Sequence, residues 1–432
     1  MKHLFEHEFL LLKQSKVFLI LIVGLLLVML YSLTNGRSYY QKQIDTITEL
    51  KKKEADTFST LKQDFSADTT TKEGNKKFWK TAEASLAIFD KKINVYWTPS
   101  PLSVLSIGNR DIFPYYQEIL PISLYMRLFK NEISNPVLLL SGSIDFSYVI
   151  IFLVPLLLIA LTFNLVSYDQ ESRISALIDL FVSSRITHYG FRFLFYLILT
   201  GSLLGLMFGM ALLFLPPGFS FQSWATLLLV SFLYGGFWLG ISFVINMAGK
   251  SSIANVSLLL CGWLLFTVLI PSVANQYTLY TYPVQTEKFT STIQRVQLTG
   301  GESEMREVLS IFYRKYPQYK AESDPEELLF SRAYLAKGQL NDEQGDRLFA
   351  SLCKRMDLKN RVLNAVAFID PAMYLQHVFC QKAQTDLADY LSYVRYVQHY
   401  NSAVKDFYFK RIYSTNILTI SDYENSYPCY NF

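Results

Sequence analysis

The residues of this chain that come closest to a catalytic motif are Gly249, Lys250 and Ser251, which have the spelling that ends a phosphate-binding loop. Such a loop binds phosphate through glycine amides, a lysine and a hydroxyl, and it follows a β-strand. The pattern also needs a glycine at position 244, where this chain has Val244, and no strand pattern precedes it. We therefore expect a tight turn here and no nucleotide site.

Metal and ion chemistry have equally little support in the sequence. His7 and Glu8 begin like a zinc-protease motif, but the second histidine is missing because residue 11 is Leu11. The 5 histidines are scattered, so we expect no catalytic, cofactor or metal site in this chain. The net charge of +4 is spread without a basic stripe, which argues against nucleic acid as a partner. If the chain moves something, another protein has to supply the energy.

The segment 167–192 offers a place to receive that energy. Asp169 is a candidate helix N-cap, and Glu171 would lie in the first turn, where the helix dipole favours an acid. An apolar stripe then follows at helical spacing, made of Ile174, Leu177, Ile178 and Phe181. The alternative interpretation is an ordinary amphipathic connection. The residues expected to contact a partner are Asp169, Glu171, Arg173, Ser175, Asp179 and Arg185.

Five windows without any Asp, Glu, Lys or Arg surround this segment, and each is close to the about 20 residues that cross a bilayer as a helix. Helices are expected because unpaired backbone groups are too costly in lipid. The sequence therefore predicts an all-α polytopic membrane protein with five transmembrane helices and no ionisable residue inside a span, which argues against an ion-coupled carrier. The windows are 17–34, 146–166, 193–215, 224–246 and 251–273.

The short loops predict the orientation of these spans. The segments 1–16, 167–192 and 247–250 carry all of the short-loop lysines and arginines, whereas 216–223 carries none. The positive-inside rule therefore places the N-terminus and the 167–192 loop in the cytoplasm. The first span reads as a retained signal anchor. Residues 1–16 read as an interfacial helix or, alternatively, as a positively charged flank.

The segments 35–145 and 274–432 are then expected outside the cytoplasm, as two mainly helical domains. Residues 41–65 have helical spacing, whereas 94–119 is rich in Pro and aromatic residues and reads as irregular. Asp324 should cap a helix that ends at Gly338. Asp370 should open another helix, which continues to about Arg411. Three cysteines lie in this outer part, and the sequence does not say which would pair: Cys353, Cys380 and Cys429.

Glycines recur every four residues in two of the spans. Small residues at this spacing let helix backbones approach closely in lipid. They predict either the seam of a permease dimer or packing within one bundle, and both interpretations stay open. The glycines are Gly201, Gly205 and Gly209 in the third span and Gly236 and Gly240 in the fourth.

A spanning helix followed by residues 168–171 and then by ALIDLFVSSRITHYGFRF is similar to the signature of type-2 ABC permeases. Glu171 matches the family's acidic position, residues 177–180 its apolar helix, and Ser184 with Arg185 the motif after that helix. Ser175 and Ala176 stand where the family commonly has Gly-Thr.

Further residues resemble a branch of these permeases that has large extracytoplasmic insertions and no assigned substrate. The C-terminal stretch 370–401 resembles the outer-domain signature of that branch, and the branch usually returns to the membrane in a sixth span, which this sequence lacks. The matching residues elsewhere are 107–111, 114–116, Asn135 with Pro136, Gly142, Asp145 with Phe146, and 155–157.

The resemblance implies the permease subunit of an ATP-driven exporter in a bacterial cytoplasmic (inner) membrane. Its expected partners are a cytoplasmic ABC ATPase, which would bind the ATP and magnesium, a second permease subunit, the lipid bilayer and possible outer partners. The chain itself would not be an enzyme. Two alternatives remain: a scaffold that passes ATPase motion to an outer partner without transport, and a sensor or receptor. The substrate, the direction of transport and the choice between homo- and heterodimer are left open.

Overall fold

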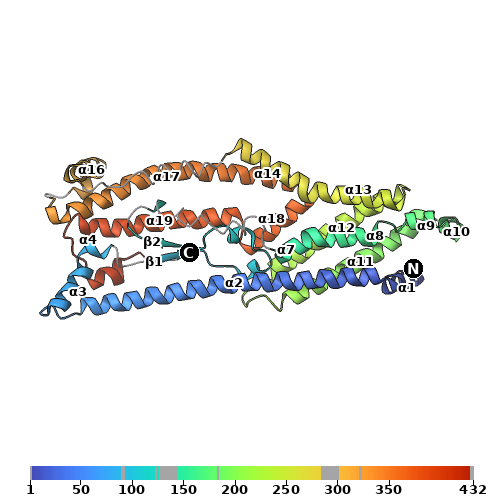
Figure 1. Cartoon of the computed structure of the whole chain (residues 1–432), viewed down its shortest axis with the longest axis horizontal. Coiled ribbons are helices and arrows are strands. Elements are labelled where there is room, and N and C mark those ends of the chain that lie inside the picture. The colour runs from blue at the N-terminus through green and yellow to red at the C-terminus, as the bar shows by residue number, and fades with distance from the viewer. Residues whose placement is uncertain are drawn as a thin grey trace.

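The structure, a computed structural model, describes residues 2–88, 93–121, 124–125, 144–181, 184–283, 301–320 and 324–428. These residues form an elongated, almost entirely helical molecule (Figure 1). One half, termed the apolar bundle, consists of the first part of α2 and the helices between residues 146 and 281. The other half, termed the polar domain, contains the remaining described residues from Arg37 onward. The end of the apolar bundle that lies far from the polar domain is termed the loop end.

The N-terminal residues form two consecutive helices, α1 (Lys2–Gln14) and α2 (Lys16–Phe65). Ser15 separates them, and its Oγ accepts a hydrogen bond from the Phe18 amide at 3.3 Å, which caps α2. With 50 residues, α2 is about 75 Å long, more than twice the thickness of a bilayer's hydrocarbon core. The predicted span 17–34 and the predicted helix 41–65 are therefore parts of one continuous helix that runs from the apolar bundle into the polar domain (Figure 1).

Five helices of the described chain are long and apolar enough to cross a membrane, and they overlap the five predicted windows. The third begins at Arg185, so both Arg185 and Arg192 belong to the helix and not to the preceding loop. The fifth continues past the predicted end at residue 273. The five are Lys16–Phe65, Phe146–Glu171, Arg185–Ala211 (α11), Phe221–Met247 (α12) and Ser252–Thr281.

Two of these helices widen into a short π-helix just before a proline. The segment η3 (Val149–Leu153) precedes Pro155, and η4 (Leu265–Leu269) precedes Pro271. Proline cannot donate a hydrogen bond to the carbonyl four residues earlier, which for Pro155 belongs to Ile151. The hydroxyl of Tyr234 in α12 donates to that carbonyl at 2.9 Å. A neighbouring helix therefore satisfies the acceptor that the proline leaves open, as an apolar environment requires.

The polar domain has one core, to which both of the expected outer segments contribute. Leu61, Val95 and Ile119 from the first segment pack with Phe312 and Tyr408 from the second. The segment 94–119, expected to be irregular, contains a small antiparallel hairpin in which Ile93 pairs with Ile119. The main elements are α3 (Lys72–Ala82), α4 (Ala84–Ala87), β1 (Ile93–Tyr96), β2 (Tyr116–Ile119), α16 (Glu302–Lys315), α17 (Glu326–Ala367), α18 (Pro371–Ala383) and α19 (Leu387–Ile412).

Some of the predicted helix ends are wrong. Asp324 does not cap α17, whose N-cap is Pro325, because the Asp324 carboxylate instead binds Arg332 at 2.8 Å. Gly338 does not end this helix either, since it lies buried inside α17, which runs to Ala367. Asp370 is confirmed as a cap and accepts hydrogen bonds from two amides of α18. The long run expected to reach Arg411 breaks at Gln384, which has a left-handed φ of 55°.

The helix α18 belongs to the polar domain in sequence but packs on the apolar bundle (Figure 1). Leu375 and Phe379 are fully buried in the same core as Phe146 and Phe208. The rings of Phe379 and Phe208 lie 6.5 Å apart, centre to centre. The two halves of the molecule therefore meet through side chains and not through a flexible linker alone. Cys380 in this helix is a free thiol, as is Cys353, while Cys429 lies outside the described residues.

Candidate coupling site

The predicted coupling segment forms two short helices at the loop end, α9 (Ser167–Glu171) and α10 (Ile174–Phe181). Arg173 joins them with a positive φ of 60°, a conformation that is uncommon for residues other than glycine. The chain therefore turns sharply between the two helices. In α10, Leu180 is largely exposed, and Ile174 is 42% exposed. The side chains of Leu177, Asp179 and Phe181, and with them much of the predicted apolar stripe, lie outside the described part of the chain.

Asp169 does not cap a helix as expected, because it lies within α9 and is buried. Its Oδ2 is 2.6 Å from Nη1 of Arg192 in α11. The Nε of Arg192 is in turn 2.5 Å from Oε1 of Glu8 in α1. Arg192 also donates to the carbonyl of Leu165 at 2.8 Å, and Tyr196 donates to Glu8 at 3.2 Å. One buried guanidinium therefore ties α1, α9 and α11 together.

We term the group of Glu8, Asp169 and Arg192 the Arg192 cluster. Burying its charges costs free energy, and removing one of its members would cost more, because a buried charge would lose its partner. All three residues are buried, and removing charges from water is favourable only when they remain paired. Two carboxylates share one guanidinium, so the loss of Arg192 would leave both without a cation. The cluster therefore fixes α9 against the bundle as long as its contacts stay complete.

Glu171 projects from the same short helix toward a different span. Its Oε1 accepts a hydrogen bond from the backbone amide of Ser252 at 2.7 Å, and its Oε2 accepts one from the Ser252 hydroxyl at 3.0 Å. Ser252 is the first residue of α13 (Ser252–Leu264), so the carboxylate lies at the positive end of a helix dipole. Ser167 also contacts the Ser252 hydroxyl, at 2.9 Å. Through these contacts α9 is joined to the fifth span as well.

The turn that precedes α9 rests on polar side chains of α12. Asn246 donates to the carbonyls of Thr162 and Ser242, both at 2.9 Å, and its Oδ1 accepts from the Val166 amide at 3.3 Å. The hydroxyls of Thr162 and Ser242 lie 2.7 Å apart. Residues 163–166, where the second long helix is interrupted, therefore have backbone groups satisfied by α12.

The remaining predicted residues fall into different places. Arg173 and Arg185 are exposed at the loop end, and Ser175 is half-buried. Among the glycines, Gly201 and Gly236 face side chains of this chain, and a Cβ on Gly201 would lie 3.1 Å from the ring of Phe232. A Cβ on Gly205, Gly209 or Gly240 would meet nothing within 4 Å. The glycines therefore fall into two groups: Gly201 and Gly236 pack inside the bundle, whereas Gly205, Gly209 and Gly240 lie on an open face.

Three residues that complete the site did not stand out in the sequence: Glu8, Arg192 and Ser252. Arg192 contributed only to the count of basic residues, and Glu8 only to an incomplete zinc motif. The one available signal was a cation immediately before an uncharged window, which predicts a partner at that depth. Gly249 lies in the turn between α12 and α13 with a φ of 68°, and the element that leads into this turn is the helix α12 and not a strand. The residues that the structure describes also contain no group of three or more His, Cys, Asp or Glu side chains that could hold a metal ion.

The residues 107–111 lie where the apolar bundle meets the polar domain. The Ile107 amide donates to Asp145, which caps the second long helix, at 3.0 Å. The Asn109 amide donates to the Thr385 carbonyl at 2.9 Å, between α18 and α19. Arg110 is buried, stacks 4.0 Å above the ring of Trp97 and donates to Gln43 of α2 at 2.8 Å. Asn135, Pro136 and Gly142 lie outside the described residues.

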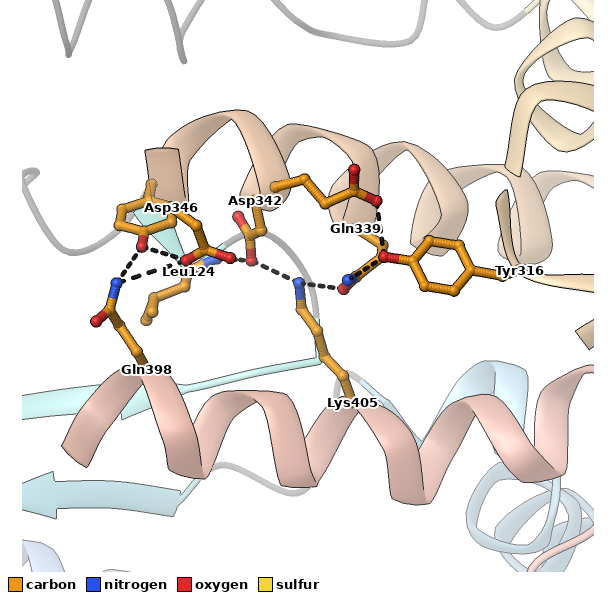
Figure 2. A network of polar contacts seen from close by, with 9 residues as sticks. Leu124, Tyr316, Gln339, Asp342, Asp346, Gln398 and Lys405 are labelled. Atoms are coloured by element: carbon orange, nitrogen blue, oxygen red, sulfur yellow. Dashed lines mark hydrogen bonds and ion pairs between the residues drawn. The ribbon is translucent and has the colours of Figure 1, made fainter. Parts of the chain in front are cut away.

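A second buried ion pair lies inside the polar domain. Lys405 of α19 is 2.5 Å from Asp342 of α17, and Asp342 also accepts from the Leu124 amide at 2.9 Å (Figure 2). One turn along α17, Asp346 accepts from the Tyr125 hydroxyl at 2.5 Å. Burial raises the pKa of the Tyr125 hydroxyl, so it keeps the proton that it donates to Asp346, and burial also raises the pKa of the Asp346 carboxyl. This group, termed the Lys405 cluster, fixes the register of α17 against α19.

The comparisons with known proteins reach only the C-terminal part of the chain. Residues 287–432 match a family model described as "Domain of unknown function (DUF3526)". This region includes α16 to α19 and excludes the apolar bundle, the Arg192 cluster and the Glu171 contact. No curated protein and no solved structure is significantly similar to the chain. The matched family covers well under half of the sequence and carries no described activity.

Proposed function

We propose that this chain is the transmembrane subunit of an ATP-driven ABC exporter, and that it converts the motion of a separate cytoplasmic ATPase into a rearrangement of its membrane helices. In this proposal the loop end lies in the cytoplasm and the polar domain outside it, in a bacterial cytoplasmic membrane. The ATPase would contact α9 and α10. A second permease subunit would complete the assembly.

The observation that carries the proposal is the pair of contacts made by α9. Within five residues, Asp169 binds Arg192 of the third span and Glu171 binds the first residue of the fifth. A partner that displaces α9 would therefore act on two spans and, through Glu8, on the N-terminal helix. The Glu171 contact suits a movable joint because it is exposed, so water can replace it when α9 shifts, whereas the buried Asp169 contact keeps α9 attached to the third span.

Purification of the full chain together with an ABC ATPase encoded beside it tests this proposal. The ATPase should co-purify, and the presence of the chain should change the rate at which the ATPase hydrolyses ATP in vesicles. Glu171→Ala should weaken that effect, while Glu73→Ala, which removes an exposed carboxylate from α3 in the polar domain, should not. If no ATPase co-purifies and the two variants behave alike, the proposal fails.

A second candidate function is favoured by the way the two halves of the molecule are joined. The helix α2 runs unbroken from the bundle into the polar domain, and α18 packs its apolar side into the bundle core. Both features suit a scaffold that transmits ATPase motion to an outer partner without moving a substrate. Disulfide cross-linking of α18 to α12 distinguishes the two functions. If the chain is a scaffold, the cross-link should stop the movement of the outer partner. If the chain is an exporter, its ATPase should still respond to the substrate.

A further inference from the structure

A groove of about 580 Å³ lies along α2 where this helix leaves the apolar bundle. Its lining contains two basic residues, Arg37 and Lys42, and two acidic ones, Asp45 and Glu49. Phe214, from the connection between α11 and α12, forms the opposite wall. None of these residues takes part in the coupling site.

Two apolar runs of the sequence, one in α2 and one in α11, end at this groove. The uncharged window of α2 ends at Thr34, which lines the groove, and Arg37 is the first charged residue after it. The helix α11 ends at Ala211, and the connection to α12 contains Phe214 followed by Pro216 and Pro217, which end the apolar run. Aromatic residues of the kind enriched at membrane interfaces flank these boundaries in the sequence: Tyr31, Tyr39 and Tyr40 in α2, and Phe221 and Trp224 in the first turn of α12. The groove therefore lies at the edge of the hydrocarbon layer when the apolar bundle is in a bilayer.

The polar groups of the groove suit a phosphate. The Nη1 of Arg37 is shielded from solvent and has no hydrogen-bond partner among the described residues, a costly condition for a guanidinium donor. Ser38 and Gln41 add a hydroxyl and an amide beside it, and Lys42 adds a second cation. Arginine and lysine are the usual ligands of phosphate oxygens, which they bind through charge-assisted hydrogen bonds.

Carboxylates follow farther from the membrane. Asp45 lies less than one helical turn beyond Lys42, and its Oδ1 accepts a hydrogen bond from Gln41 at 2.8 Å. No cation pairs with Asp45 in the part of the chain that the structure describes. Along α2 the order is therefore apolar surface, cations and then an acid, which matches acyl chains, phosphate and an ammonium group.

We propose that this groove binds the headgroup of a phospholipid that carries a primary amine, such as phosphatidylethanolamine, in the leaflet on the side of the polar domain. Arg37 and Lys42 hold the phosphate, and Asp45 receives the ammonium group. The proposal needs only that the apolar bundle is embedded in a bilayer, so it is independent of any ATPase. A lipid bound here would brace α2 against the connection between α11 and α12.

Native mass spectrometry of the full chain, released from vesicles of phosphatidylcholine doped with phosphatidylethanolamine or phosphatidylglycerol, measures which lipid is retained. Arg37→Gln should lower the retention of both doped lipids about tenfold, the loss expected for one charge-assisted hydrogen bond. Asp45→Asn should lower only phosphatidylethanolamine, to the level of phosphatidylglycerol. Lys52→Gln, a basic residue of α2 outside the groove, should change neither. Lys42→Gln serves as a second phosphate variant if Arg37→Gln is unstable.

Millimolar inorganic phosphate distinguishes the lipid from free phosphate as the source of the anion. It should leave lipid retention unchanged, because a free ion lacks the acyl chains that hold the headgroup in place. Displacement of the lipid by phosphate would overturn the proposal, as would equal retention in the Arg37, Lys42 and Lys52 variants. Equal loss of both lipids in Asp45→Asn would contradict the ammonium site.

Discussion

The Arg192 cluster and the Lys405 cluster each bury a cation with carboxylates, and they differ in what they join. The Arg192 cluster connects α1, α9 and α11, three helices of the loop end. The Lys405 cluster connects α17 and α19, two long helices within the core of the polar domain. Around Lys405, α17 and α19 also share a large aromatic core. Around Asp169, α9 is only five residues long, and its position depends on polar contacts.

The difference suggests that the two regions have different mechanical roles. Apolar packing is spread over many small contacts, so α17 and α19 should move as one body. The helix α9 is held by a few strong and directional bonds, which a partner can exchange for others. We therefore assign signal reception to the loop end and stiffness to the polar domain. The predictions below test that division, from the largest expected effect to the smallest.

Arg192→Met should have the largest effect. It leaves Glu8 and Asp169 buried without a cation, which should cost about 3–5 kcal/mol of stability. It should also abolish any effect of the chain on the ATPase. Thermal unfolding in detergent and ATP hydrolysis in vesicles measure the two quantities. Lys52→Met, at an exposed position of α2 in the polar domain, is the control, and a similar result for both variants would contradict the role of the cluster.

Lys405→Met should destabilise the polar domain by about 3 kcal/mol, because Asp342 then lacks its buried cation but keeps the Leu124 amide. In contrast to Arg192→Met, the Lys405→Met molecules that remain folded should still change the rate of ATP hydrolysis as much as the wild type does. The test compares hydrolysis per folded molecule in the two variants. If Lys405→Met uncouples the ATPase as fully as Arg192→Met, the proposed division between the two regions is wrong.

A smaller effect is expected from Asp389, at the start of α19. Burial, with repulsion from Asp386, raises the pKa of Asp389 from 3.8 to about 7. Between these values the folded protein holds a proton that the unfolded chain has lost, so stability should fall as the pH rises from about 4 to 7. Asp389→Asn should therefore stabilise the protein at pH 8 and not at pH 4, by about 1 kcal/mol at most, because the group is only half-buried.

The control for this pH effect is Asp406. Partial burial acts against the shift, but hydrogen bonds from Lys410 and Tyr319 lower the pKa of Asp406 below 3.8. Its carboxylate is thus ionised in both the folded and the unfolded chain at pH 5 and above. Asp406→Asn should change the melting temperature equally at pH 5 and pH 8. A pH-independent effect of Asp389→Asn would show that Asp389 does not titrate near neutrality.

The spans could be predicted because the absence of charge over about 20 residues is a strong local signal. The ends of helices were harder, as Gly338 shows: it lies buried inside α17, and the local sequence does not distinguish such a glycine from one that ends a helix. Glu171 was singled out as a contact for a partner ATPase, which stays a prediction, and its contact with Ser252 of this chain was not predicted. Glu8 and Arg192 are 184 residues apart, and no local pattern specifies such a pairing.

The most direct test of the account is a double-mutant cycle on Glu171 and Ser252, read out as the change that the chain causes in ATP hydrolysis by its partner. Glu171→Ala, which removes both hydrogen bonds, should reduce that change most; Ser252→Ala, which removes the hydroxyl but keeps the backbone amide, should reduce it less; and the double variant should match Glu171→Ala alone. Losses that simply add up, or single variants that match the wild type, would contradict the claim that α9 acts on the fifth span through this carboxylate.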